Sequence, residues 1–223
     1  MTIKLFLQAI GKFLAGLILI GLLLFLPAGT FGYWNAWLLI GILFGPRFIA
    51  GVVMMARDPE LLKKRLNAKE EQKEQKAVVA LSGMMFLAAF VVAGLNFRFS
   101  WIVLPAWSAY VGAGIFLAAY LMYAEVMREN AYLSRTIEVQ ENQKVVDTGL
   151  YGVIRHPMYS ATLLLFLSMG FVLGSLISFL ILLLYMPIIA MRMKNEEKVL
   201  TEGLEGYEAY RKKVKYKVIP LIW

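Results

Sequence analysis

The stretch 161-ATLLLFLSMGFVLGSLISFLILLLYMPIIA-190 decides the fold, because its thirty residues include no charged side chain. A single helix of this length would be about 45 Å long at 1.5 Å per residue, whereas the hydrocarbon core of a bilayer is about 30 Å thick. Gly174-Ser175 interrupts the stretch near its middle. We expect two half-length helices, over 159–173 and 176–191, that turn at this pair and return to their starting side.

One tilted helix over 159–191 is the alternative, and the distribution of basic residues favours the hairpin. The loop 57–76 carries seven Lys and Arg and the tail from Arg192 onward carries eight, whereas the turns 27–32 and 98–100 carry none and one. Because basic segments stay on the cytoplasmic side, this places both termini, the 57–76 loop and the connector before the hairpin in the cytoplasm. A hairpin keeps the connector and the tail on that same side.

The remaining apolar runs predict four complete transmembrane helices. The chain has 223 residues, of which 60% are hydrophobic and 17% charged, and its apolar residues gather in runs of the length that a bilayer requires. These runs are 5–26, 33–55, 77–97 and 101–124. We therefore expect an all-α integral membrane protein, with a four-helix membrane region over 1–124 and a second region over 125–223 that contains the hairpin and a basic cytoplasmic tail. The charged loop 57–76 is expected to be a solvated or interfacial helix.

Composition excludes several classes of function. The chain has no cysteine, and His156 is its one histidine, so disulfides, thiolate metal sites and polyhistidine sites are excluded, and we predict no metal site. The net charge of +8 arises from residues that flank the apolar runs. It therefore indicates contact with anionic membrane lipids rather than with nucleic acid.

Two polar segments flank the predicted hairpin. One, Asp147–Ser160, precedes it, and the other, Arg192–Glu197, follows it. A hairpin brings both segments to the cytoplasmic membrane surface, at the mouth of an apolar helix bundle. This position suits a site that receives one ligand from water and another from the bilayer.

The two segments carry a recognisable pattern. Arg155-His156-Pro157-Met158-Tyr159, followed by Glu196-Glu197, resembles the signature of the isoprenylcysteine carboxyl methyltransferases, and the phospholipid N-methyltransferases have a related form. The flanks agree, with Val145-Val146-x-x-Gly149-x-Tyr151 before the motif and Gly206-Tyr207-x-x-Tyr210 after it. The resemblance covers about 140–223. It departs at Ala161, where the family often has glycine, and at Gly174-Ser175, where it often has Asn-Pro.

The resemblance implies S-adenosylmethionine as the cofactor, bound in a cytoplasmic cofactor-binding region. Arg192 matches an arginine that the family associates with substrate, so it is the candidate catalytic and substrate-binding residue. The residues implied for cofactor binding are Gln140, Gln143, Lys144, Val145, Val146, Tyr151, His156, Pro157, Met158, Tyr159, Glu196 and Glu197.

The function that the resemblance favours is carboxyl O-methylation of an isoprenylcysteine-like or other lipidic substrate. A carboxylate is ionised at neutral pH and needs no general base, and Arg192 can hold it with two parallel hydrogen bonds. The alternative is N-methylation of a phospholipid amine, which would need Glu196, Glu197 or His156 as a base. A small transporter is less favoured because most spans lack ionisable residues, and a non-catalytic membrane scaffold is a further alternative.

Arg47 follows Gly45-Pro46 inside the second predicted span. A charge within a membrane helix is costly and often functional, so Arg47 is a candidate for binding an anionic group of the substrate. The alternative is that Pro46 kinks the helix and Arg47 extends to the cytoplasmic surface.

Overall fold

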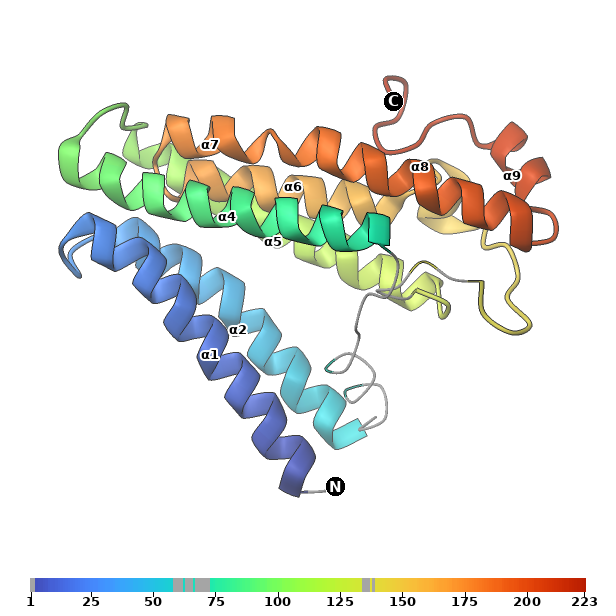
Figure 1. Ribbon diagram of the computed structural model, residues 1–223, viewed down its shortest axis with the longest axis horizontal. Coiled ribbons are helices and arrows are strands. Elements are labelled where there is room, and N and C mark those ends of the chain that lie inside the picture. Colours follow the sequence, from blue (N-terminus) through green and yellow to red (C-terminus); the bar gives the residue numbers. More distant parts are fainter. Residues whose placement is uncertain (1–2, 58–61, 63–65, 67–72, 134–136, 138) are drawn as a thin grey trace. The chain divides into compact units, whose positions relative to one another are not determined.

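The structure, a computed structural model, describes residues 3–57, 62, 66, 73–133, 137 and 139–223 (Figure 1). Its regular elements are helices, which confirms the predicted all-α class. They are α1 (Ile3–Ala28), α2 (Trp34–Arg57), α4 (Lys73–Phe99), α5 (Ala106–Glu129), the 3-10 turn η1 (Gly149–Gly152), α6 (Pro157–Val172), α7 (Leu176–Leu182), α8 (Tyr185–Gly203) and α9 (Tyr207–Lys213). The helix expected over 57–76 lies largely outside the described residues.

Five helical segments in the described part of the chain are long and apolar enough to cross a membrane. They are Leu5–Ala28, Trp34–Arg57, Lys76–Phe99, Ala106–Glu129 and Leu176–Gly203. Most of their side chains are not buried within the protein, and a helix satisfies its own backbone hydrogen bonds, so lipid is the solvent that suits them. The chain is therefore a multi-pass membrane protein.

The link before α5 is longer than predicted, so the fourth span begins at Ala106 instead of 101. Here the chain pairs with the hairpin turn, where the Leu104 amide donates to the carbonyl of Gly174 at 2.9 Å. The side chain of Asn96 accepts the amide of Ile102 at 2.9 Å. These bonds give the backbone amides of Ile102 and Leu104 partners although the link is not helical. Pro105 then precedes Ala106, the first residue of α5.

The predicted hairpin is present, with its turn at Gly174-Ser175. Gly174 has φ +65°, the left-handed conformation that glycine adopts readily. Ser175 caps α7, its side chain accepting from the amide of Ser178 at 3.2 Å. Along the two legs, Gly170 lies against Phe179, and the hydroxyls of Thr162 and Tyr185 are 3.2 Å apart. The legs therefore run antiparallel.

The second leg of the hairpin is not half-length, and the prediction that it ends at Met191 was wrong. After a short interruption at 183–184, α8 continues to Gly203. The sequence after Met191 is rich in Lys, Glu and Met, which favour a helix, whereas the first leg stops at Val172. Helix α8 therefore carries apolar membrane residues first and the second polar segment afterwards.

The described chain divides into two compact units that each collect separate stretches of sequence. One contains α1, α2 and the turn of the hairpin. Its helices approach closely at glycines: a Cβ on Gly94 would lie 2.6 Å from the Leu24 carbonyl, and one on Gly112 would lie 2.9 Å from the Val172 amide. The other unit contains 115–166 and 184–223 and holds the polar segments. The predicted division into 1–124 and 125–223 stays a prediction.

Candidate functional site

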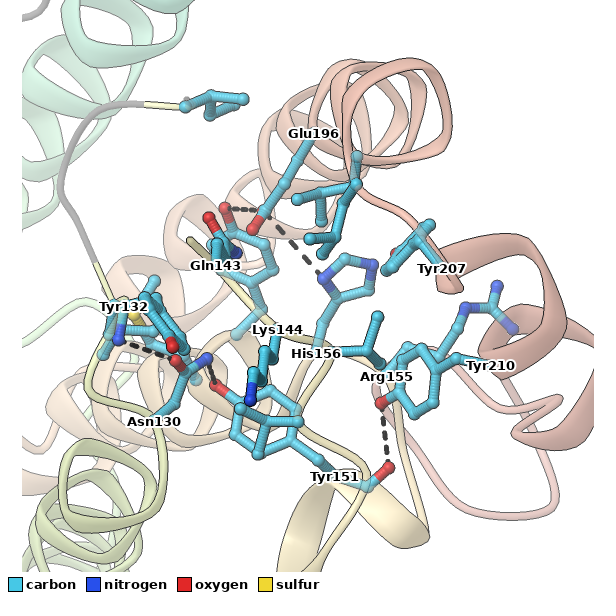
Figure 2. A pocket seen from close by; sticks show the side chains of 18 of the residues that line it. Asn130, Tyr132, Gln143, Lys144, Tyr151, Arg155, His156, Glu196, Tyr207 and Tyr210 are labelled. Atoms are coloured by element: carbon cyan, nitrogen blue, oxygen red, sulfur yellow. Dashed lines mark hydrogen bonds and ion pairs between the residues drawn. The ribbon is translucent and has the colours of Figure 1, made fainter. Parts of the chain in front are cut away.

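A pocket opens in the unit that contains the polar segments, and it encloses about 850 Å³ of space, part of it open to solvent (Figure 2). The connector after α5, the start of α6, the second half of α8 and α9 all contribute to its wall. Its lining residues are Asn130, Tyr132, Leu133, Ile137, Gln143, Lys144, Val145, Val146, Tyr151, Arg155, His156, Met158, Tyr159, Arg192, Glu196, Leu200, Leu204, Tyr207 and Tyr210.

One wall is a single face of α8. Arg192, Glu196 and Leu200 recur every four residues, which places them in one row along the helix, and Leu204 directly follows the last helical residue. All four line the pocket. The row changes from charged to apolar along its length, so the two ends of this wall offer different chemistry.

Tyr159 connects the two polar segments at the charged end. Its hydroxyl donates to the carboxylate of Glu196 and accepts from Nε of Arg192 at 3.0 Å. Nδ1 of His156 lies 3.9 Å from the same carboxylate (Figure 2). Residues about 35 positions apart in the chain therefore meet on one pocket wall.

Glu197 points to a different set of partners. Its Oε1 lies 2.8 Å from Arg155 Nη2 and 3.2 Å from His156 Nε2. Its Oε2 lies 3.1 Å from Lys217 Nζ. The carboxylate of Glu197 accepts a hydrogen bond from Nε2 of His156, and this bond fixes the orientation of the imidazole ring. Nδ1 of His156 therefore lies on the side of Glu196.

The segment after α9 holds the motif in place. The amides of Arg155 and His156 donate to the carbonyls of Tyr216 and Lys217 at 2.9 and 2.8 Å. Ser160 Oγ donates to the carbonyl of Val218 at 2.6 Å, and Arg155 Nη1 donates to that of Val214 at 2.8 Å. The backbone of the motif is thus paired along its length, which gives His156 a fixed position.

Tyr151 is a residue of η1 and lines the pocket away from the α8 wall. Its hydroxyl accepts from Asn130 Nδ2 at 2.9 Å, and its carbonyl accepts from the Tyr210 hydroxyl at 2.8 Å (Figure 2). Burial raises the pKa of Tyr151 to about 12, so the phenol is neutral at physiological pH. The carboxylate of Glu129 accepts the amide of Leu150 at 3.1 Å, which anchors the turn that presents Tyr151.

The structure brings most of the sequence-predicted site residues together. The pocket wall includes Gln143, Lys144, Val145, Val146, Tyr151, His156, Met158, Tyr159, Arg192 and Glu196.

Four predicted residues are not on that wall. Gln140 bonds within the connector, where its amide donates to Gln143 Oε1 at 2.8 Å and its side chain donates to the Tyr132 carbonyl at 2.7 Å. Pro157 is the first residue of α6, and Glu197 faces the cluster of Arg155, His156 and Lys217. Arg47 is an exposed residue of α2, in the other compact unit.

Sequence reasoning missed several lining residues. Leu200 and Leu204 extend the four-residue spacing from Arg192 and Glu196, so helical periodicity could have found them. Tyr207 and Tyr210 belong to the sequence pattern that flanks the motif, but the pattern by itself does not place them in the pocket. Asn130 and Tyr132 lie in the non-periodic connector, where the sequence offers no signal.

The fold and the pocket define a multi-pass helical membrane protein with a polar site at the base of a helical hairpin. Residues 107–205 match the model of the phospholipid methyltransferase family, which is also the family of the isoprenylcysteine carboxyl methyltransferase-like proteins. The resemblance seen in the sequence is thereby confirmed, and the family indicates a membrane methyltransferase. No curated protein matches the chain significantly.

Proposed function

We propose that the protein is an S-adenosylmethionine-dependent methyltransferase that methylates the carboxylate of an isoprenylcysteine-like or other lipidic substrate at the cytoplasmic face of a membrane. The observation that carries this proposal is the meeting of Arg192, Tyr159 and Glu196 on one pocket wall, beside His156. The distribution of Lys and Arg along the sequence supports the cytoplasmic orientation.

The chemistry of the pocket fits the cofactor. S-adenosylmethionine supplies a methyl group on a positively charged sulfur when it is bound. The carboxylate of Glu196 suits an ammonium group or ribose hydroxyls, and the backbone of Gln143–Val146 offers hydrogen-bonding groups along the facing wall. Tyr151, His156, Met158 and Tyr159 would complete the contacts.

The predicted residues off the pocket wall receive supporting roles in this proposal. Glu197, which three basic side chains approach, orients His156 instead of contacting the cofactor. Pro157 starts α6 at a position where proline is favoured. Gln140 orders the connector next to Gln143.

Arg192 is the residue that favours a carboxylate substrate. Its guanidinium is always charged and planar, which suits a carboxylate, and the Tyr159 hydroxyl orients its Nε. A bound carboxylate needs no deprotonation, so the protein has to align the reacting atoms and exclude water. Arg47 remains a second candidate for binding an anionic group, without a contact that supports it.

The position of Arg192 also suits a substrate that arrives from the bilayer. Arg192 lies on α8 directly after the apolar residues of the Leu176–Gly203 span. A lipid tail can therefore stay beside the apolar part of the helix while its polar head reaches Arg192.

The test uses the full chain purified in detergent, with labelled S-adenosylmethionine offered prenylcysteine carboxylates and phospholipid amines in parallel. We expect methyl transfer to the carboxylates. Arg192→Ala should reduce that transfer at least about thirtyfold, since removing one partner of a charge pair in a site costs about 2–5 kcal/mol, while S-adenosylhomocysteine affinity is retained. Arg192→Lys, which keeps the charge, should recover part of the rate. No cofactor binding by calorimetry at millimolar concentration would contradict the proposal.

Amine N-methylation of a phospholipid is the second candidate, and the description of the matching family favours it. It would require a base, for which Glu196 and His156 are the candidates on the wall. The rate would then rise with pH as the amine loses its proton, whereas carboxylate methylation would not depend on that step. Cofactor binding with no transfer to any acceptor would instead indicate a non-catalytic scaffold.

A further inference from the structure

The hydroxyl of Tyr207 has no role in the site described so far. Tyr207 is 4% exposed and lines the pocket, yet its hydroxyl has no hydrogen-bond partner among the described residues. The hydroxyls of Tyr151, Tyr159 and Tyr210 are all bonded. Buried polar groups in proteins nearly always have a partner, so the Tyr207 hydroxyl calls for one from a ligand.

The ring of Tyr207 has apolar neighbours, whereas the charged side chains of Glu197, Glu196 and Arg155 act electrostatically on its hydroxyl. Tyr207 packs with Leu204 and Tyr210 in a buried cluster, and Val145 and Leu200 lie against it. The rings of Tyr207 and Tyr210 have centroids 5.8 Å apart. Such a wall suits a flat, uncharged ring whose edge accepts one hydrogen bond.

The row along α8 shows which end of the pocket this is. Arg192 and Leu200 are eight residues apart in one row, which corresponds to about 12 Å along a helix. The charged end holds Arg192 and Glu196, and the apolar end holds Leu204 and Tyr207. Figure 2 shows Tyr207 and Glu196 on different sides of His156. A ligand with a charged part and an uncharged ring can therefore fit in one orientation.

We propose that the Tyr207 hydroxyl donates a hydrogen bond to a ring nitrogen of the cofactor's purine, so that Leu200, Leu204, Tyr207 and Tyr210 form the base subsite. This inference rests on the proposed function, because it takes S-adenosylmethionine as the ligand. The charged end is then left for the sulfonium and the methyl acceptor. Burial, together with Glu197 and Glu196, raises the pKa of Tyr207 well above its usual value, so the phenol keeps the proton that it donates.

The test compares the full chain with its Tyr207→Phe variant, using S-adenosylhomocysteine and analogues in which one purine ring nitrogen is replaced by CH. We expect Tyr207→Phe to bind S-adenosylhomocysteine about three- to tenfold more weakly, the size of one net neutral hydrogen bond. One of the analogues should bind the wild-type protein more weakly by a similar factor. For that analogue alone, Tyr207→Phe should bind the analogue as tightly as it binds S-adenosylhomocysteine.

Thermal unfolding without ligand separates this role from a structural one. Because the hydroxyl has no partner in the described chain, the unliganded Tyr207→Phe variant should be as stable as the wild type or more stable. Tyr210→Phe is the matched control. It removes a hydroxyl that already bonds the Tyr151 carbonyl, so it should lower stability and leave the order of analogue affinities unchanged.

Two results would overturn the inference alone, given a wild-type protein that binds S-adenosylhomocysteine. One is that Tyr207→Phe binds S-adenosylhomocysteine with the same affinity as the wild type. The other is that each analogue binds more weakly than S-adenosylhomocysteine by the same factor in both proteins. A destabilised Tyr207→Phe variant would also count against it, since it would reveal a partner within the chain. A wild-type protein that binds no S-adenosylhomocysteine would overturn the proposed function together with this inference.

Discussion

The guanidinium of Arg155 lies against the carboxylate of Glu197, with both Nε and Nη2 2.8 Å from Oε1. The two side chains are only 7% and 11% exposed. His156 and Lys217 approach the same carboxylate, so one acidic side chain neutralises basic groups from the motif and from the segment after α9. The ion pair therefore joins two parts of the chain that would otherwise repel each other.

Removing this carboxylate should be strongly destabilising. Glu197→Ala leaves the buried Arg155 without its partner, which typically costs about 3–5 kcal/mol. Thermal unfolding in detergent measures the loss. The control is Glu125→Ala, which breaks the Arg128–Glu125 pair, whose side chains are 74% and 43% exposed, and should change stability little. Similar shifts for the two variants would show that the Arg155–Glu197 pair is not the buried link described here.

Gly149→Ala should disrupt the turn that presents Tyr151. Gly149 has φ +49°, and a Cβ there would lie only 1.4 Å from Glu129 Oε1, so the Glu129 side chain must leave the Leu150 amide. We expect lower thermal stability and weaker S-adenosylhomocysteine binding. Adding Glu129→Ala removes the clash but not the backbone strain, so it should restore stability only in part. A Gly149→Ala variant as stable as the wild type would contradict this geometry.

Tyr159→Phe should slow methyl transfer about tenfold or more, because displacing groups at a reacting centre by about 1 Å can have effects of this size. The variant lacks the hydroxyl that contacts both Glu196 and Arg192. Single-turnover rates with saturating cofactor measure the effect. Thr162→Val is the control, since it breaks the hydrogen bond to Tyr185 one turn further along α6, and should affect stability instead of rate. An unchanged rate in Tyr159→Phe would argue against this hydroxyl as an organiser of the site.

Alkaline pH should destabilise the folded pocket between about pH 10 and 12. The pKa of Tyr151 is raised to about 12 by burial, whereas an unfolded tyrosine has a pKa of about 10. In this window the unfolded state binds fewer protons than the folded state, so the free energy of unfolding falls as pH rises. Stability measured against pH should fall less steeply in Tyr151→Phe. The slope does not vanish, because burial also raises the pKa values of Tyr207 and Tyr210.

The sequence predicted the features that depend on local pattern. Apolar length predicted the spans, and the asymmetry of basic residues predicted the reversal at Gly174-Ser175. The second leg of the hairpin was predicted too short because loss of hydrophobicity after Met191 was taken as the end of the helix, although the polar residues that follow are good helix formers.

Features that depend on long-range pairing were not predictable. The pattern Glu196-Glu197 gives no indication that one carboxylate faces the pocket and the other faces Arg155, since adjacent residues on a helix differ by about 100° in direction. Asn130 and Tyr132 enter the wall from a connector without periodicity. The orphan hydroxyl of Tyr207 is visible only once the partners of the neighbouring tyrosines are known.

The pairing of the motif with the segment after α9 has a consequence for biosynthesis. Ser160 and its acceptor, the carbonyl of Val218, are 58 residues apart in the chain. A ribosome adds about 5–20 residues per second, so the Arg155–Tyr159 motif waits several seconds after its own synthesis before the segment after α9 that fixes it exists. During that interval the membrane hairpin can already be inserted, and the pocket is completed only after translation has passed Val218.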